Sequence, residues 1–333
     1  MDNVTHGLMG LVAAGLLNNY AIPAKGVNMI NEKKAVFWTA LIASEIPDID
    51  ILYRFTSDAA YLNMHRGLSH SIGGILFLAL AVALMVRIIY PSIRAKRLLM
   101  VSLICISLHV LLDLLTSYGT QVLYPFDHTR FALDVLPIVD IYLLILLVAS
   151  LAFLMSRSAK LGPATFIAFL VFAYISARTG MHWYAYQQVG SQLPAEKKVQ
   201  LAVIPGLFNP FSWQYIAKTT SSYVTGDVSL DGIEKTTREY PIIPGDTNAY
   251  AALKTPAAHI FLSFARFPYI TCQQYSSYKV VSITDLRYLS KNHALFLVQV
   301  KIDQNQKVIF SGLGSELGQP ENSGIPVNTP THN

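Results

Sequence analysis

The residues best suited to chemistry in this chain are histidines and aspartates that come in short groups between apolar segments. The groups are Pro47-Asp48-Ile49-Asp50, His65-Arg66-Gly67-Leu68-Ser69-His70, and His109 with Asp113 four residues later. Imidazole nitrogens and carboxylate oxygens bind divalent transition metals. Ionisable groups beside apolar segments are costly to bury without partners, so a function is the default hypothesis for them. One divalent cation would be a partner for several of these groups at once.

Each group also has an interpretation without a metal. On a helix, His109 and Asp113 share one face and can simply hydrogen-bond to each other. Asp48 and Asp50 are typical of an exposed acidic turn, and Ser69 can cap the helix that follows it. These explanations are independent of one another, whereas a metal site explains all the groups together. We therefore favour the metal site.

This interpretation predicts a metal-dependent active site. Because only oxygen and nitrogen donors are available, zinc is favoured, with manganese, iron or nickel as alternatives. There are more donors than one tetrahedral ion needs, which favours two or more ions that share carboxylates. We expect a metal-bound hydroxide as the nucleophile, with Glu45 or one of the aspartates Asp48 and Asp50 as the general base. Arg66 either binds an oxyanion or is a snorkelling interfacial arginine, and these interpretations weigh equally. The predicted metal ligands are His6, Asp48, Asp50, His65, His70, His109 and Asp113.

The elements that must position these residues are apolar helices. The chain of 333 residues is 53% hydrophobic and only 14% charged, whereas a soluble domain has about 25% charged residues. Composition therefore predicts a membrane protein. Two short helices are expected at residues 4–17 and 35–46. Four membrane spans, each near the ~20 residues that a span needs, are expected at residues 71–90, 98–115, 136–155 and 163–184.

Basic residues mark the expected cytoplasmic side of these helices. By the positive-inside rule, connections rich in lysine and arginine face the cytoplasm. The histidine and aspartate groups then all lie toward the outer face of the membrane. The same rule accounts for the net charge of +5, so we expect no nucleic-acid partner. The basic residues concerned are Lys25, Lys33, Lys34, Arg87, Arg94, Lys96, Arg97, Arg157 and Lys160.

Beyond residue 189 the pattern changes to short alternating segments, which predict β-strands. Strands are expected at residues 222–229, 259–267, 279–285, 294–302 and 307–310, after a linker marked by Pro194, Pro205, Gly206 and Pro210. The predicted fold class is a mainly α membrane helical bundle followed by a small antiparallel β domain. The predicted domains are a helical metal-site domain at 1–189, a β-rich extracytoplasmic domain at 190–314 and a disordered tail at 315–333.

The same groups resemble the YdjM-like family of inner-membrane metal-dependent hydrolases. The resemblance includes Asp2-Asn3-Val4-Thr5-His6-Gly7 at the start and Thr116-Ser117-Tyr118-Gly119-Thr120 after Asp113. Asn209-Pro210-Phe211-Ser212-Trp213, Phe264-Ala265-Arg266-Phe267-Pro268 and Asp285-Leu286-Arg287-Tyr288 are similar to longer members of the family. That family is distantly similar to zinc-dependent phospholipases C and single-strand nucleases, which implies phosphodiesterase chemistry. The second downstream His-to-Glu helix pair of those enzymes has no match here, so the expectation is one or two metals and not three.

The resulting hypothesis is a multi-pass protein of the bacterial inner membrane that hydrolyses phosphoester bonds of a lipid-like substrate at the outer face. Two alternatives remain open from the sequence. A divalent-metal transporter would need polar residues that continue through the spans, and few are present. A non-enzymatic envelope assembly protein braced by its metal would have every coordination position filled by protein.

Overall fold

The structure, a computed structural model, divides the chain into two compact units. The first consists of Met1–Leu52, Met64–Trp183 and Pro205–Pro210, and the second of Tyr53–Asn63, Tyr184–Ile204 and the chain from Phe211 onward. The tail expected at 315–333 and Pro194 of the expected linker lie outside the described residues. The structure describes residues 1–20, 28–155, 161–193, 200–233, 237–242, 247–290, 293–294 and 296–314.

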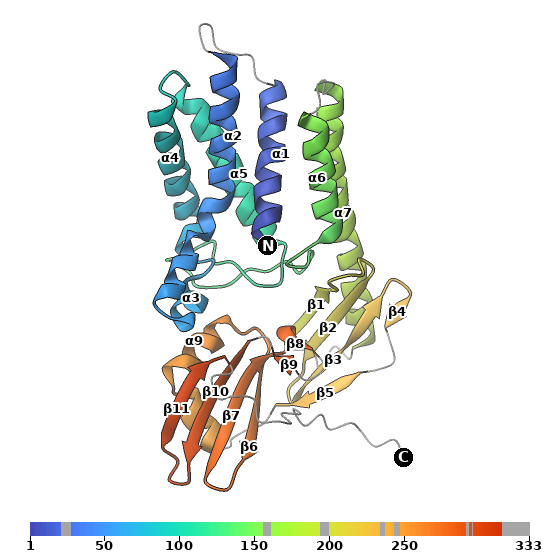
Figure 1. Cartoon of the computed structure of the whole chain (residues 1–333). Coiled ribbons are helices and arrows are strands. Elements are labelled where there is room, and N and C mark those ends of the chain that lie inside the picture. Colours follow the sequence, from blue (N-terminus) through green and yellow to red (C-terminus); the bar gives the residue numbers. More distant parts are fainter. Residues whose placement is uncertain are drawn as a thin grey trace. The chain divides into compact units, whose positions relative to one another are not determined.

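Helices make up most of the first unit (Figure 1). Within it, α2 packs against α1, α4 and α5, and α1 also packs against α5 and α6. Small side chains fill these contacts, with Ala35, Ala40 and Ala79 fully buried, so the helix backbones approach closely. The helices are α1 (Asn3–Tyr20), α2 (Met29–Glu45), α4 (Ile72–Ile89), α5 (Ala95–Leu114), α6 (Ile141–Met155) and α7 (Leu161–Gln192), of which α7 continues into the second unit.

The approach of α1 to α2 depends on glycine. A Cβ atom added to Gly10 would lie 2.6 Å from Oγ of Ser44, closer than van der Waals contact allows. Gly7, one turn earlier, faces Glu45 in the same way, with 2.8 Å to Oε1. These two glycines bring the start of α1 against the end of α2, where the polar cluster described below begins.

Among the described residues, two helices are long and apolar enough to cross a membrane, α4 and α5, while α6 is apolar but shorter. Four full spans are therefore not confirmed. The reason for the shorter α6 is local. Oδ1 of Asp140 accepts a hydrogen bond of 2.9 Å from the backbone N–H of Leu143, which starts the helix at Ile141 and not at residue 136.

Three short helices connect α2 to α4: η1 (Ile46–Phe55), α3 (Asp58–Met64) and η2 (Leu68–His70). The α-helix α2 ends just before Pro47, as the steric restriction on the residue before proline predicts. η2 leads into Ser71, whose Oγ caps α4 by accepting a 3.0 Å hydrogen bond from the N–H of Gly74. The expectation that Ser69 is the cap is therefore wrong.

The connection between α5 and α6, residues 115–140, is bonded to the ends of two helices. The N–H of Ile72, at the start of α4, donates to the carbonyl of Val122 at 3.0 Å. The N–H of Leu133 donates to the carbonyl of Leu114, at the end of α5, at 2.8 Å. This connection, called the 115–140 segment below, is thus held at the level of the helix ends.

The second unit carries antiparallel sheets. One sheet has the order β1-β2-β3-β4 with β5 beside β3, another has the order β11-β10-β7-β6, and β8 pairs with β9. Helices α8 (Thr247–Leu253) and α9 (Pro256–Phe264) pack against strands of the β11-β10-β7-β6 sheet. The strands are β1 (Gln200–Pro205), β2 (Ser212–Lys218), β3 (Ser222–Ser229), β4 (Gly232–Ile233), β5 (Arg238–Pro241), β6 (Pro268–Gln274), β7 (Tyr278–Asp285), β8 (Leu289–Ser290), β9 (His293–Ala294), β10 (Leu297–Asp303) and β11 (Val308–Leu313).

A helical region followed by an antiparallel sheet domain is confirmed, with differences in detail. The strand expected at residues 259–267 is wrong, because most of that segment belongs to α9. Thr255 caps this helix by accepting a 3.3 Å hydrogen bond from the N–H of Ala258, and Pro256 occupies its first turn. The expected linker is also partly wrong, since it contains β1.

Candidate metal centre

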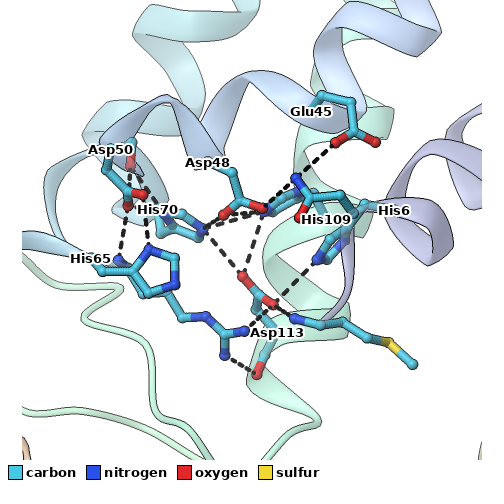
Figure 2. Close-up of polar contacts among 12 residues, drawn as sticks. His6, Glu45, Asp48, Asp50, His65, His70, His109 and Asp113 are labelled. Atoms are coloured by element: carbon cyan, nitrogen blue, oxygen red, sulfur yellow. Dashed lines mark hydrogen bonds and ion pairs between the residues drawn. The ribbon is translucent and has the colours of Figure 1, made fainter. Parts of the chain in front are cut away.

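Four side chains from three elements converge in the first unit (Figure 2): Asp48 of η1, His70 of η2, and His109 and Asp113 of α5. Nε2 of His70 lies 3.1 Å from Oδ2 of Asp113 and 3.5 Å from Oδ1 of Asp48. Nε2 of His109 lies 3.5 Å and 3.7 Å from the same two oxygens. In a tetrahedral zinc site with bonds of about 2.0–2.2 Å, the donor atoms are roughly 3.3–3.6 Å apart. The spacing therefore fits one small divalent cation.

Both imidazoles turn the same nitrogen toward this position. Nδ1 of His109 lies 2.7 Å from the carbonyl oxygen of Ser44, and because a carbonyl only accepts, this nitrogen carries the proton. Nδ1 of His70 lies 3.0 Å from Oγ of Ser69, whose hydroxyl donates to Asp50. The two Nε2 atoms lie 3.2 Å apart, and each would be a lone-pair donor to a metal when the ring's only proton is on Nδ1. A single proton can be shared between only two of the four converging donor atoms, whereas a metal cation can bind all four.

Burial raises the cost of leaving these charges unmatched. The side chains of His70, His109 and Asp113 are 0–1% exposed, and that of Asp48 is 16% exposed. Oδ2 of Asp113 makes no hydrogen bond to any described residue, although it faces both imidazoles. The guanidinium of Arg66 and the amine of Met1 pair with the other oxygen, Oδ1, so Oδ2 is the oxygen of this buried carboxylate that is available to a further cation. This orphaned oxygen is the observation that best fits a resident divalent metal.

A second group of possible ligands shares Asp48 and adds Asp50 and His65. Asp50 accepts hydrogen bonds from Nδ1 of His65 at 2.8 Å, from the N–H of Arg66 at 2.9 Å and from Oγ of Ser69 at 3.2 Å. It therefore holds the residues around His65 in place, as carboxylates behind metal ligands commonly do. The same group can offer donors to a second ion.

The electrostatic environment favours an ionised Asp48 and a neutral His65. Burial by itself raises the pKa of the Asp48 carboxyl, but His109 and His70 outweigh burial and hold that pKa well below its usual range. Burial lowers the pKa of the His65 imidazole, although Asp50 acts in the opposite direction. Asp48 is therefore ionised and His65 neutral near pH 7. Metal ligands of these types bind in those forms.

Arg66 is buried beside the cluster and pairs with a predicted ligand. Its Nη2 lies 2.7 Å from Oδ1 of Asp113, and its Nη1 donates to Oγ1 of Thr116 at 2.9 Å. The guanidinium also lies over the ring of Tyr118, 4.7 Å from its centroid. Because the Arg66 side chain is 4% exposed, it is not a snorkelling interfacial arginine. Its φ of +58° is unusual for a residue other than glycine, and the hydrogen bond from its N–H to Asp50 stabilises that conformation.

His6 lies next to the four-donor group without being part of it. Its ring stacks on the ring of His109, with the centroids 3.7 Å apart. Its Nε2 lies 3.3 Å from Oδ1 of Asp113, an oxygen that the amine of Met1 also contacts. The structure thus brings the seven predicted ligands into one region, as a group of four, an adjacent pair and His6 against an imidazole (Figure 2).

Glu45 lies at the edge of the cluster and is hydrogen-bonded to Asn3, a residue that the sequence analysis did not predict as part of the site. Nδ2 of Asn3 donates to Oε2 of Glu45 at 3.2 Å and to Oδ2 of Asp48 at 3.4 Å. The carbonyl of Ser44 and the hydroxyl of Ser69 are two further contributors that were not anticipated. Asn3 and Ser69 belong to the sequence motifs that carry the family resemblance, and this membership could have identified them as residues of the site. The contribution of a backbone carbonyl, in contrast, cannot be inferred from the type of the residue that carries it.

Comparison with known proteins covers both units of the chain. Residues 1–188 match the family described as YdjM inner membrane protein, and residues 248–317 match the domain described as YfhP C-terminal alpha/beta plait domain. The chain is 25% identical over 317 residues to the uncharacterized protein YfhP of Bacillus subtilis (strain 168), which covers 94% of this chain and 95% of that protein. No solved structure matches. The first of these matches includes every residue of the candidate metal centre.

Proposed function

This chain belongs to the YdjM inner membrane protein family, and from that premise we propose that it is a membrane-bound, metal-dependent hydrolase of phosphoester bonds. Family membership supports a location in the inner membrane. The hydrolase activity, the position of the site at the outer face and the preference for zinc or manganese are parts of the proposal.

One observation carries it: two imidazoles with protonated Nδ1 atoms and two carboxylates converge on one buried position. A divalent cation bound there would supply Lewis acidity, which activates water and polarises a phosphoryl oxygen. The donors that would hold it are Asp48, His70, His109 and Asp113, and Asp50 with His65 would hold a second ion.

The remaining residues have roles that follow from their positions. Asp48 is the most exposed of the four donors, so substrate approaches from its side. Glu45, half-buried and held by Asn3, is the proposed general base. Nε of Arg66 is buried and donates to no described residue. This spare donor supports a role in binding a phosphoryl oxygen, to which guanidinium groups are well matched.

The proposal is tested by metal analysis of the protein purified in detergent. We expect about one or two equivalents of a transition metal, lost in His70→Ala and Asp113→Ala. His128→Ala, which changes an exposed histidine, is the matched control and keeps the metal. The metal-loaded protein should hydrolyse bis(p-nitrophenyl) phosphate, and the two site variants should not. Full metal content in both variants, or no bound metal after reconstitution, would overturn the assignment.

A second candidate function, a structural role for the metal, is supported by the number of protein donors at the site. Four protein donors are enough to complete a tetrahedral site, which is typical of structural zinc. The protein would then be a metal-braced envelope assembly protein and not an enzyme. Replacement of the metal by cobalt(II) separates the two: phosphate should change the visible spectrum if a coordination position is open to ligands. An unchanged spectrum together with no hydrolysis would favour the structural role.

A further inference from the structure

The 115–140 segment exposes large apolar side chains next to the candidate metal centre. They are 38–97% exposed, and Phe126 is the most exposed of them. Soluble surfaces rarely gather so many large apolar side chains on one segment, and such a group marks an interaction site. The exposed residues are Leu123, Phe126, Phe131, Leu133, Ile138 and Val139.

Backbone hydrogen bonds place this segment at the level where the two candidate membrane spans end. It is bonded to the first residue of α4 and to the last residue of α5, as described above. A third bond, from the N–H of Asp2 to the carbonyl of Ile138 at 3.1 Å, joins it to the start of α1. The exposed apolar surface of α4, which includes Leu76, Phe77 and Leu80, continues from the helix end that the segment contacts. The segment is therefore bonded directly to a helix whose exposed apolar side chains are suited to contact with lipid.

The same segment forms part of the frame of the metal centre. The N–H of Gln121 donates to the carbonyl of Arg66 at 2.8 Å. Nη1 of Arg130 donates to the carbonyl of His65 at 3.0 Å. Two residues of the polar cluster are thus held by the segment whose other side chains are apolar and exposed.

We propose that the 115–140 segment lies in the head-group boundary of the membrane and presents lipid phosphoesters to the metal centre. Apolar and aromatic side chains on a segment at this depth bind the boundary between head groups and acyl chains. The substrate class is then a phosphoester with an acyl or isoprenoid tail that remains in the bilayer. The choice of substrate rests on the proposed function, whereas the membrane contact does not.

The membrane contact is tested with a nitroxide label at Phe126→Cys, in a Cys105→Ala/Cys272→Ser background reconstituted into phosphatidylglycerol nanodiscs. Accessibility to oxygen, which partitions into lipid, is compared with accessibility to an aqueous nickel chelate. Leu80→Cys in α4 is the lipid-facing control, and Ser277→Cys in the turn between β6 and β7 is the aqueous control. We expect a ratio at residue 126 that is close to that at residue 80 and several-fold above that at residue 277. A ratio equal to that at residue 277 would overturn the proposal.

A second measurement addresses the substrate. Phe126→Ser should lower hydrolysis of phosphatidylglycerol in nanodiscs several-fold and leave hydrolysis of soluble bis(p-nitrophenyl) phosphate unchanged. Equal loss on both substrates would overturn the role in substrate presentation. If the label reports lipid contact but neither substrate is hydrolysed, the proposed function fails and the membrane contact stands. The two ideas are thus distinguishable.

Discussion

The guanidinium of Arg66 and the carboxylate of Asp113 form a buried ion pair, in which Nη2 lies 2.7 Å from Oδ1. The other oxygen of Asp113 faces the two imidazoles and has no hydrogen-bond donor among the described residues. The carboxylate of Asp113 therefore pairs with Arg66 through one oxygen and can bind the proposed metal through the other. The ion pair fixes the direction of the second oxygen, which prepares the site for the ion.

Replacement of Arg66 by alanine should affect both stability and metal binding. Removal of one partner of a buried ion pair costs about 3–5 kcal/mol because the other charge stays buried. Loss of a group that orients a ligand weakens metal binding by about 10–100-fold. Thermal unfolding and metal titration in nanodiscs measure the two effects. Arg54→Ala is the control, since its pair with Asp58 is exposed at both ends and such pairs contribute about 0–1 kcal/mol. Equal effects of the two changes would contradict the prediction.

Ser69 and Ser71 should behave differently although they are two residues apart. Ser69 hydrogen-bonds Nδ1 of His70, so Ser69→Ala should weaken metal binding by about 10–100-fold with little loss of stability. Ser71 caps α4, so Ser71→Ala should lower stability by about 1 kcal/mol and leave metal affinity unchanged. Both variants can be measured by the same titration and melting experiments. The assignment fails if Ser69→Ala keeps the wild-type affinity.

Gly10→Ala should perturb the metal centre through the contact between α1 and α2. The added Cβ meets Ser44, whose carbonyl fixes the proton on Nδ1 of His109. We expect a lower melting temperature and weaker metal binding. Gly180→Ala in α7 is the matched control, because its Cβ meets nothing within 4 Å. An alanine there should stabilise the helix by up to about 1 kcal/mol. A similar loss in both variants would show that packing at Gly10 is not special.

Asp285 should be as important to the second unit as Asp113 is to the first. It is fully buried and accepts hydrogen bonds from the N–H of Arg266 at 2.9 Å and from Nη2 of Arg287 at 2.7 Å. Asp285→Ala should therefore cost about 3–5 kcal/mol, because Arg287 is left buried without its partner. Metal content should be unchanged. Asp303→Ala, at an exposed turn, is the control and should cost about 1 kcal/mol or less.

The residues that cluster in the candidate metal centre were predictable from the sequence, but their arrangement within it was not. Residue type and spacing indicate that His109 and Asp113 share a helix face. They do not distinguish a ligand from a residue that orients a ligand. Asp50 was expected to bind metal, and the structure places it both in a group that could hold an ion and as the acceptor of three hydrogen bonds. That distinction depends on rotamers and on backbone groups such as the carbonyl of Ser44, which the sequence pattern does not contain.

The fold was predictable where one type of pattern was dominant. The apolar run of α4 matches its expected range closely, because no capping or breaking residue interrupts it. The run at residues 259–267 is short and largely apolar, and a run of that length fits a buried helix as well as the strand that its alternation predicts. The structure forms α9 there because Thr255 and Pro256 provide a start signal that outweighs the pattern. The range of α6 was overestimated because the capping role of Asp140 was not recognised.

The four-donor group also has a consequence for biogenesis. His70 and His109 are 39 residues apart in the chain, and at about 5–20 residues per second the ribosome needs roughly 2–8 s to synthesise that interval. During it the first half of the site is already made, but α5 is still missing. A metal bound by all four donors would therefore require α5 to have packed against α2, so metal occupancy would report that the helices of the site have assembled. A chain truncated before α5 lacks His109 and Asp113, so it should not retain the metal.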